Sequence, residues 1–386
     1  MICINLAMLN ARREETDGMT EGYEFYGAEV SYYSGKVRAY LRFKRIPFIE
    51  YGATADVYRN VILPRVGWPV IPVVVTPEGE TLQDSTDIID ALEERFPEAP
   101  VYPATTKQRL AALLLELYGD EWLKIPAMHY RWTKNRDFAL SEFGRLSAPE
   151  LPPEGQREVA DRIAKPFAGA LPFLGATPKT AEAIEKSYEG LLGELDRHFA
   201  SYEFLFGTRP SIGDFGLIGP LYAHQFRDPA SGELMKRIAP NVVRWVERMM
   251  KPPHPKGGEF LPRDEVPETL IPVLARMMRE MVPVLVSTAH LFRKWVEEHP
   301  ETAAGTGEVP RAIGTHEFTL EGVQESRAVF PYDLWMLQRP LDFISSLEAD
   351  EKLRAADLLR AAGGETLLDF PAFPRLARTN FKVALA

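Results

Sequence analysis

The segment from Pro69 to Phe96, PVIPVVVTPEGETLQDSTDIIDALEERF, decides the fold. Its β-branched run over residues 70–75 is typical of a buried strand, although Pro72 removes one backbone donor near the start. Such a proline suits the first residues of a strand or a cis peptide bond. A turn over residues 76–80 and a short return strand over residues 81–83 then predict a β-hairpin.

A helix start follows the hairpin directly. The step Asp84-Ser85-Thr86-Asp87 consists of N-cap residues and acids, and the apolar residues after it recur at helical spacing. An extended backbone edge beside a helix N-terminus can hold a small peptide, because the edge pairs with its main chain and the helix end attracts its carboxylate. The segment therefore predicts a site for a small peptide-like ligand.

The residues before this segment complete a domain. Strands are predicted at residues 23–28 and 47–51, a helix at residues 34–45, and an irregular helical connection at residues 54–66. The resulting order, β-α-β-α-β-β-α within about 75 residues, is that of a thioredoxin-like α/β domain. We therefore expect this domain to span residues 22–100, after a flexible tail over residues 1–21.

The character of the chain changes after the linker at residues 97–100. Helical periodicity begins at residue 107 and strand signals nearly vanish, so residues 105–386 are predicted to form an all-helical domain whose last part, residues 300–386, is a long C-terminal extension. At Ser211 to Asp214 a Ser-x-x-Asp step predicts a capping box at a helix start. Helices are expected at residues 107–123, 126–142, 155–172, 178–200, 212–226, 233–250, 268–298, 322–347 and 350–362.

Composition excludes several classes of function. A formal net charge of -10 argues against nucleic-acid binding, and no segment is apolar enough for a membrane span. The single cysteine, Cys3, rules out a disulfide framework and points to a reducing compartment, so we expect a cytoplasmic protein. The seven histidines lack metal-ligand spacing, and no glycine-rich phosphate loop is present. Neither a metal nor a nucleotide cofactor is expected.

Four short motifs, in this order, resemble the glutathione transferase family over residues 23–250. They are the turn Ser31-Tyr32-Tyr33-Ser34-Gly35-Lys36-Val37-Arg38, the strand Val70-Ile71-Pro72, the pair Asp84-Ser85, and the step from Ser211 to Asp214. The resemblance implies that glutathione is a co-substrate. The main chain of Ile71, before a cis Pro72, would pair with its cysteinyl part, and Asp84 and Ser85 would bind its γ-glutamyl end. Trp68 would border the tripeptide or only shape the loop.

The resemblance also implies a hydroxyl that faces the glutathione sulfur. A thiol with a pKa of about 8.5 is only slightly ionised at neutral pH, and the thiolate is the nucleophile. A hydroxyl donor beside a helix N-terminus stabilises the charged form. We rank Ser31 first, Ser34 second and Tyr32 third. A serine before a helix is also an ordinary N-cap, and the absence of a cysteine in this turn disfavours dithiol chemistry.

An aromatic cluster follows in the first helices of the second domain. Trp122, His129, Tyr130 and Trp132 are candidates for an apolar wall that would hold a hydrophobic electrophile. Aromatic residues at helical spacing are more often core residues, and this alternative stays open.

Two functions remain for the whole chain. The first is an enzyme, a glutathione-dependent transferase or lyase that adds the thiolate to a hydrophobic electrophile. The alternative is a non-catalytic binding or scaffold protein with the glutathione transferase fold. In either case the resemblance implies a homodimer.

Overall fold

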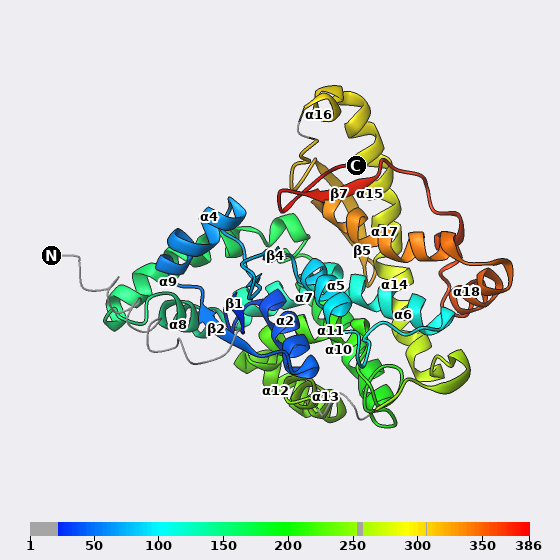
Figure 1. Ribbon diagram of the computed structural model, residues 1–386, viewed down its shortest axis with the longest axis horizontal. Helices are drawn as coiled ribbons and strands as arrows, with labels where there is room; N and C mark the ends of the chain where they lie inside the picture. Colours follow the sequence, from blue (N-terminus) through cyan, green and yellow to red (C-terminus); the bar gives the residue numbers. More distant parts are fainter. Residues whose placement is uncertain (1–21, 253–257, 306) are drawn as a thin grey trace.

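The structure is a computed structural model that describes residues 22–252, 258–305 and 307–386. The predicted tail over residues 1–21 lies outside these ranges. Figure 1 shows the N-terminal domain in blue and cyan beside the green helices of the second domain, with the C-terminal extension in orange and red at the upper right. Among the described residues, no helix is both long and apolar enough to cross a membrane.

The N-terminal domain is a four-stranded sheet flanked by helices, in the predicted order. The sheet has the strand order β2-β1-β3-β4, in which β1 and β2 are parallel and β3 is antiparallel to both of its neighbours. The strands are β1 (Tyr23–Gly27), β2 (Phe48–Gly52), β3 (Val73–Val75) and β4 (Thr81–Gln83). The helical segments are α2 (Tyr32–Lys44), α3 (Ala55–Val57), η1 (Tyr58–Ile62), α4 (Leu63–Val66) and α5 (Ser85–Arg95).

Helices make up the second domain as far as residue 304. Its helical segments are α6 (Thr106–Leu117), η2 (Tyr118–Trp122), α7 (Lys124–His129), η3 (Tyr130–Lys134), α8 (Arg136–Ser147), α9 (Pro153–Gly169), η4 (Pro172–Leu174), α10 (Ala181–Phe199), α11 (Ile212–Pro220), η5 (Leu221–Phe226), α12 (Pro229–Ile238), α13 (Pro240–Met250), η6 (Pro262–Asp264), η7 (Glu268–Leu270), α14 (Ile271–Glu280), α15 (Val282–Glu298) and α16 (Pro300–Ala304).

Helix α11 is the central contact between the two domains. Phe215 packs against Tyr40 and Phe43 of α2, with ring centroids 5.5 and 5.9 Å apart. The predicted capping box is present, since the carboxylate of Asp214 accepts the N–H of Ser211, and it also accepts the indole N–H of Trp245 at 3.0 Å. These contacts fix the N-terminal domain on the helical domain through an apolar interface.

The extension contains strands as well as helices. It consists of the hairpin β5 (Thr315–Leu320) and β6 (Val323–Ala328), then α17 (Pro331–Ser346), α18 (Ala349–Ala361), η8 (Glu365–Asp369), and a second hairpin, β7 (Leu376–Thr379) and β8 (Lys382–Leu385). The helix predicted over residues 322–347 is therefore wrong in its first part, because residues 323–328 pair with β5. The reason is local: Glu321 and Gly322 both have positive φ, and every second residue of β5 is buried.

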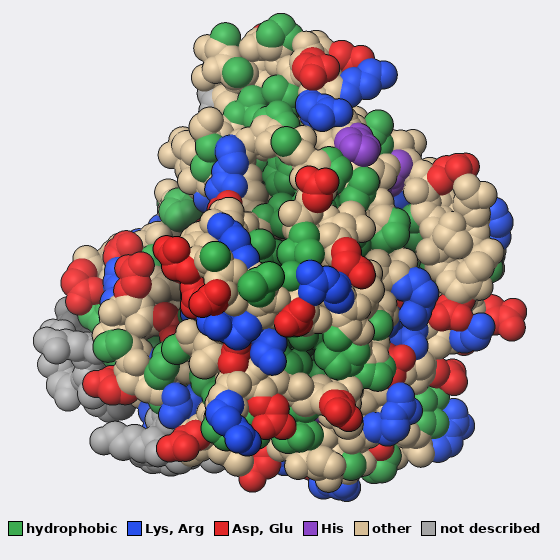
Figure 2. All heavy atoms as spheres, turned by 90° about the vertical axis from the view of Figure 1, so that its right-hand side faces the viewer, with side chains coloured by type: hydrophobic (Ala, Val, Ile, Leu, Met, Phe, Trp, Pro, Cys, Tyr) green, Lys and Arg blue, Asp and Glu red, His purple; other side chains and the backbone are tan. Residues whose placement is uncertain are grey.

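The surface carries charges of both signs. On the face in Figure 2, which is the side of the molecule with α18, acidic and basic side chains are interspersed among hydrophobic ones. The described part of this face therefore offers no large area of one sign of charge.

Candidate functional site

The strand register brings the predicted ligand-binding residues to one end of the sheet. Val73 pairs with Tyr26 on one side and with Gln83 on the other. Pro72 therefore lies at the same end of the sheet as the residue after Gln83, which is Asp84. The end of β1, which leads into the turn before α2, is also at this edge. The Ile71–Pro72 peptide bond is cis, as expected.

The main chain at Ile71 and the N-terminus of α5 lie at this edge of the sheet. No hydrogen bond joins the main chain of Ile71 to another residue within the ranges that the structure describes. Asp84 is the N-cap of α5 with a φ of 83°, and its carboxylate accepts the N–H of Thr86 at 3.0 Å. Ser85 is the first, buried residue of the helix. An extended main chain and a helix N-terminus thus lie side by side.

The three candidate hydroxyls have different surroundings. Ser31 is half-buried and is the N-cap of α2, where its Oγ accepts the N–H of Ser34 at 3.3 Å. Ser34 lies inside the helix and is fully buried, and its Oγ accepts the N–H of Ala28. Tyr32 donates its phenol to the carbonyl of Gly119, and burial raises its pKa well above the usual value. Ser31 is therefore the best placed of the three to meet a ligand.

A buried arginine fixes the loop before Ser31. Arg131 of η3 donates to the carbonyl of Val30 at 2.7 Å and forms a two-bond pair with Asp228 at 2.8 Å. Both side chains are almost completely buried. The position of Ser31 is thus set by the helical domain as well as by its own helix.

The four residues of the proposed apolar wall do not face one common cleft. The Trp122 indole donates to Glu280 at 3.2 Å, and His129 contacts Glu185 at 2.9 Å. Burial lowers the pKa of His129. Tyr130 packs against Tyr188, and Trp132 packs in a separate cluster with Phe143 and Phe167. All four are buried, which favours the alternative that they are core residues.

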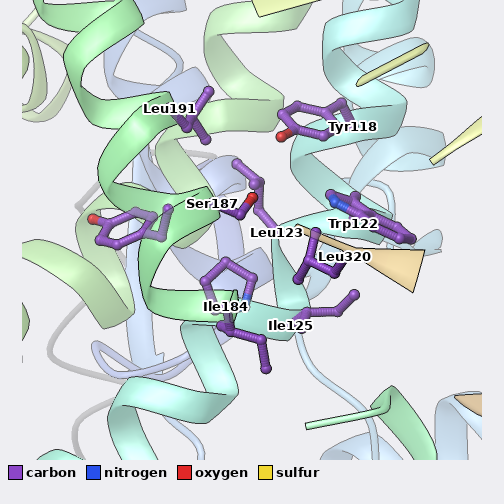
Figure 3. A pocket seen from close by; sticks show the side chains of 10 residues that line it. Tyr118, Trp122, Leu123, Ile125, Ile184, Ser187, Leu191 and Leu320 are labelled. Carbon is purple, nitrogen blue, oxygen red and sulfur yellow. The ribbon is translucent and has the colours of Figure 1, made fainter. Parts of the chain in front are cut away.

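A small internal cavity lies beside Trp122 (Figure 3). Its volume is about 10 Å³, and Ile184, Ser187 and Leu320 are among its lining residues. This space is at the lower limit for one water molecule, about 10–15 Å³. A larger, open groove of about 490 Å³ lies between α17, α18 and η8, with Leu341, Leu353 and Phe370 along it.

The first feature that sequence reasoning missed is a buried charge cluster between α2 and the helical domain. The Lys36 ammonium donates to Thr86, Glu116 and Asp120 at 3.1, 2.8 and 2.5 Å, and its side chain is fully buried. Burial lowers the pKa of Lys36, but Asp120 and Glu116 raise it by more, so the ammonium stays charged. A lysine in the first turns of a helix is usually exposed to solvent, so its position in the sequence carries no signal of this cluster.

The second missed feature joins the extension to the ligand edge. The Tyr332 phenol donates to Oδ2 of Asp84 at 2.5 Å. Arg378 lies between Asp84 and Asp87, with nitrogen–oxygen distances of 3.7 and 3.3 Å, and also donates to the side chain of Gln83. No sequence signal links these residues, because Tyr332 is 248 positions away from Asp84.

No group of three or more histidine, cysteine or acidic side chains suited to a metal ion is found in the described part of the chain. The groups that this edge of the sheet presents to a ligand are main-chain N–H and C=O groups, hydroxyls and carboxylates.

Comparison with known families agrees with this geometry. Residues 25–100 match the glutathione S-transferase N-terminal domain, and residues 178–248 match the glutathione S-transferase C-terminal domain. The chain therefore belongs to the glutathione S-transferase family. Neither match extends beyond residue 248. A comparison with curated proteins gave no match.

Solved structures of low identity are also similar to this chain. A glutathione S-transferase from Rhodospirillum rubrum F11 is 15% identical, with 64% of this chain and 96% of that chain covered and a TM-score of 0.38. The beta-etherase LigF from Sphingobium sp. strain SYK-6 is 16% identical, with 61% and 97% covered and a TM-score of 0.45. A glutathione S-transferase from Methylobacillus flagellatus KT, with glutathione bound, is 19% identical, with 61% and 98% covered and a TM-score of 0.37.

Proposed function

We propose that the protein binds glutathione at the end of the sheet and activates its thiol for attack on a hydrophobic electrophile, as a transferase or lyase. One observation carries this proposal: the strand register places the Ile71–Pro72 edge, the N-terminus of α5 and the turn before α2 at the same end of the sheet. Such an edge matches an extended tripeptide with a carboxylate at one end.

Each part of the tripeptide then has a matching group. The main chain of Ile71 pairs with the cysteinyl residue, and Trp68 borders the same edge. The N–H and hydroxyl of Ser85 bind the γ-glutamyl carboxylate at the positive end of α5, and Asp84 binds the γ-glutamyl ammonium. In this arrangement the cysteinyl sulfur points toward the start of α2.

Ser31 activates the glutathione thiol. Its hydroxyl donates to the sulfur, and the N-terminus of α2 adds positive potential, so both favour the thiolate over the thiol. The sulfur lone pair forms the new bond to the electrophilic carbon. The electron pair of the bond that breaks leaves with the leaving group, and the thiol proton goes to solvent.

The test compares three single variants in a conjugation assay with a chloronitrobenzene electrophile. We expect Ser31→Ala to lower kcat by about tenfold or more, as loss of a donor to a developing anion does, with glutathione affinity changed less. Ser31→Thr, which keeps the hydroxyl and the cap, should restore activity. Equal activity in Ser31→Ala, Ser34→Ala and Tyr32→Phe would refute this role for Ser31.

A non-catalytic binding protein is the second candidate function. It is favoured by the hydrogen bond from Tyr332 to Asp84, which engages a proposed ligand group. Titration calorimetry separates the two functions. Heat on addition of glutathione and a higher Tm support glutathione binding, on which the enzyme depends, whereas no heat and no shift in Tm at millimolar glutathione, in the wild-type chain and in Arg378→Gln alike, support the scaffold.

Two further properties belong to the proposal by analogy with the family. We expect a homodimer, to be measured by light scattering after size-exclusion chromatography, and a cytoplasmic location, to be measured by cell fractionation. A monomer at micromolar concentration would contradict the first expectation.

A further inference from the structure

The extension contacts the proposed glutathione site at both of its ends. At the end formed by Trp68, the guanidinium of Arg311 lies 4.9 Å from the centre of the indole ring. Phe381, between β7 and β8, packs against the same buried apolar cluster as Trp68 and Ile71 do. At the other end, Tyr332 and Arg378 contact Asp84. The extension therefore lies along the whole site.

Tyr332 and Arg378 contact the carboxylate of Asp84, which is the group that a γ-glutamyl ammonium would need. One carboxylate oxygen of Asp84 accepts the N–H of Thr86, and the other accepts the Tyr332 hydroxyl at 2.5 Å. The guanidinium of Arg378 is the cation beside this carboxylate and that of Asp87. A hydroxyl donor and a positive charge from the chain itself thus stand where the ammonium of the ligand would stand.

The guanidinium of Arg378 and the γ-glutamyl ammonium are both cations, so only one of them can pair with these carboxylates at a time. Asp84 and Asp87 together attract the guanidinium of Arg378, while Arg339, which also acts on Asp87, is paired with Asp90 at 2.5 Å. A ligand ammonium placed beside Arg378 would meet a like charge within a poorly solvated site, which is unfavourable. Ammonium and guanidinium therefore compete for the same carboxylates.

We propose that the β7–β8 hairpin is a built-in lid on the glutathione site: its Arg378, together with Tyr332 of α17, holds Asp84 until the γ-glutamyl ammonium displaces them. This inference rests on the proposed function. The site thus has a closed state, which this structure shows, and an open state that binds the tripeptide.

The attachment of the hairpin fits such a movement. Its strands are held by other parts of the extension. Two hydrogen bonds join Gln338 and Leu376 at 2.8 and 2.7 Å, and β8 makes main-chain hydrogen bonds to Gly307 and Val309 and an ion pair with Glu308. Among the described residues, its hydrogen bonds and ion pairs to the N-terminal domain all come from Arg378. Opening therefore breaks the contacts of the Arg378 guanidinium and the apolar contacts of the Phe381 ring, and the Tyr332 hydroxyl also leaves Asp84.

The experiment is a glutathione titration by calorimetry on the full chain and its single variants. Because closure lowers the fraction of competent molecules, Arg378→Gln should tighten the apparent Kd by about five- to tenfold, and Tyr332→Phe by about two- to fivefold. Arg375→Gln is the matched control. Arg375 lies next to the same hairpin but pairs with Asp342 on the exposed surface, so the Kd should not change.

A second readout follows the lid directly. Glutathione should increase hydrogen exchange at the amides of residues 376–385 in the wild-type protein, and Arg378→Gln should show the faster exchange without ligand. Both variants are first compared with wild type by circular dichroism, and Tyr332→Phe tests the lid if Arg378→Gln fails to fold.

The outcomes separate the two proposals. Weaker binding by Arg378→Gln overturns the lid, because Arg378 would then be a ligand contact. Wild-type binding with an unchanged Kd in Arg378→Gln and Tyr332→Phe overturns the lid and leaves the proposed function standing. Binding by the variants but not by wild type supports the lid. No binding by any of the proteins overturns the proposed function, and the lid with it.

Discussion

Two junctions of the molecule bury charge in different ways. Lys36, between the N-terminal domain and α6, has three hydrogen-bond acceptors within 3.1 Å, and two of them are carboxylates. Arg327, where the extension meets η2, lies 3.5 Å from Asp333, and two of its three nitrogens have no hydrogen-bond partner among the described residues. The cation of the first junction has all its hydrogen bonds, although one oxygen each of Glu116 and Asp120 has no hydrogen-bond partner among the described residues, whereas the cation of the second junction lacks two. Satisfied buried charges specify one arrangement, whereas unsatisfied ones cost free energy.

The aromatic rings around Arg327 compensate only in part for its missing hydrogen bonds. Its guanidinium lies 5.3 to 5.9 Å from the ring centres of Trp122, Phe318 and Phe330. Such contacts each contribute less than a well-formed hydrogen-bonded ion pair in a buried site. Removal of the charge should therefore cost more free energy at the junction of the N-terminal domain with α6 than at the junction with the extension.

Lys36→Met should have the largest effect. The variant leaves Asp120 buried without its cation and Glu116 with only Arg339, 3.5 Å away, so the free energy of unfolding should fall by about 3–5 kcal/mol. Denaturant titration measures it. Arg59→Met is the control, since the Arg59–Asp56 pair is exposed and should contribute less than about 1 kcal/mol. A loss below about 1 kcal/mol in Lys36→Met would contradict the tight match at this junction.

Arg327→Met should cost less, about 2 kcal/mol. The substitution removes the cation–π contacts and the pair with Asp333, but it also removes two nitrogens that are buried without hydrogen bonds in the described part of the chain. Lys124, 3.7 Å from Asp333, still balances that carboxylate. The same denaturant titration applies. If Arg327→Met destabilises the protein as much as Lys36→Met, the two junctions are equivalent and the comparison fails.

The sequence revealed the features whose causes are local. The cis bond at Pro72, the cap at Asp84 and the capping box at Ser211 are each set by a few neighbouring residues, so short motifs predicted them. Their meeting at one end of the sheet followed from the order of strands and helices. The candidate Ser31 came from the resemblance of the turn at residues 31–38 to the glutathione transferase family.

Long-range contacts had no such signal. The Tyr332–Asp84 bond joins residues 248 positions apart, and the pattern around Tyr332 is that of any amphipathic helix. Helical spacing also did not distinguish core aromatics such as Trp132 from residues of a cleft. The hairpin β5–β6 did carry a signal, the turn at Glu321 and Gly322, which the helix-forming residues after it obscured.

The smallest expected effect is a pH dependence located in the extension. His316 of β5 is buried, and its Nδ1 lies 2.9 Å from Oγ of Ser287. Burial lowers its pKa to about 4; Arg327 adds to the shift and Asp333 opposes it. The unfolded chain, with a histidine pKa of about 6.5, therefore binds a proton that the folded chain does not bind between these values.

Acidification therefore destabilises the folded chain through His316. Stability from His316 is complete above a pH of about 6.5 and is lost as the pH falls toward about 4, so acidification from about pH 7 to about pH 5.5 should cost about 1 kcal/mol. His316→Gln should lose about 1 kcal/mol less than wild type over that interval in denaturant titrations. His198→Gln is the matched variant, because burial also lowers the pKa of His198, in α10, to about 4. If only His198→Gln reduces the pH dependence, the extension unfolds apart from the transition that the titration records, and its junction is weaker than the Arg327 contacts alone imply.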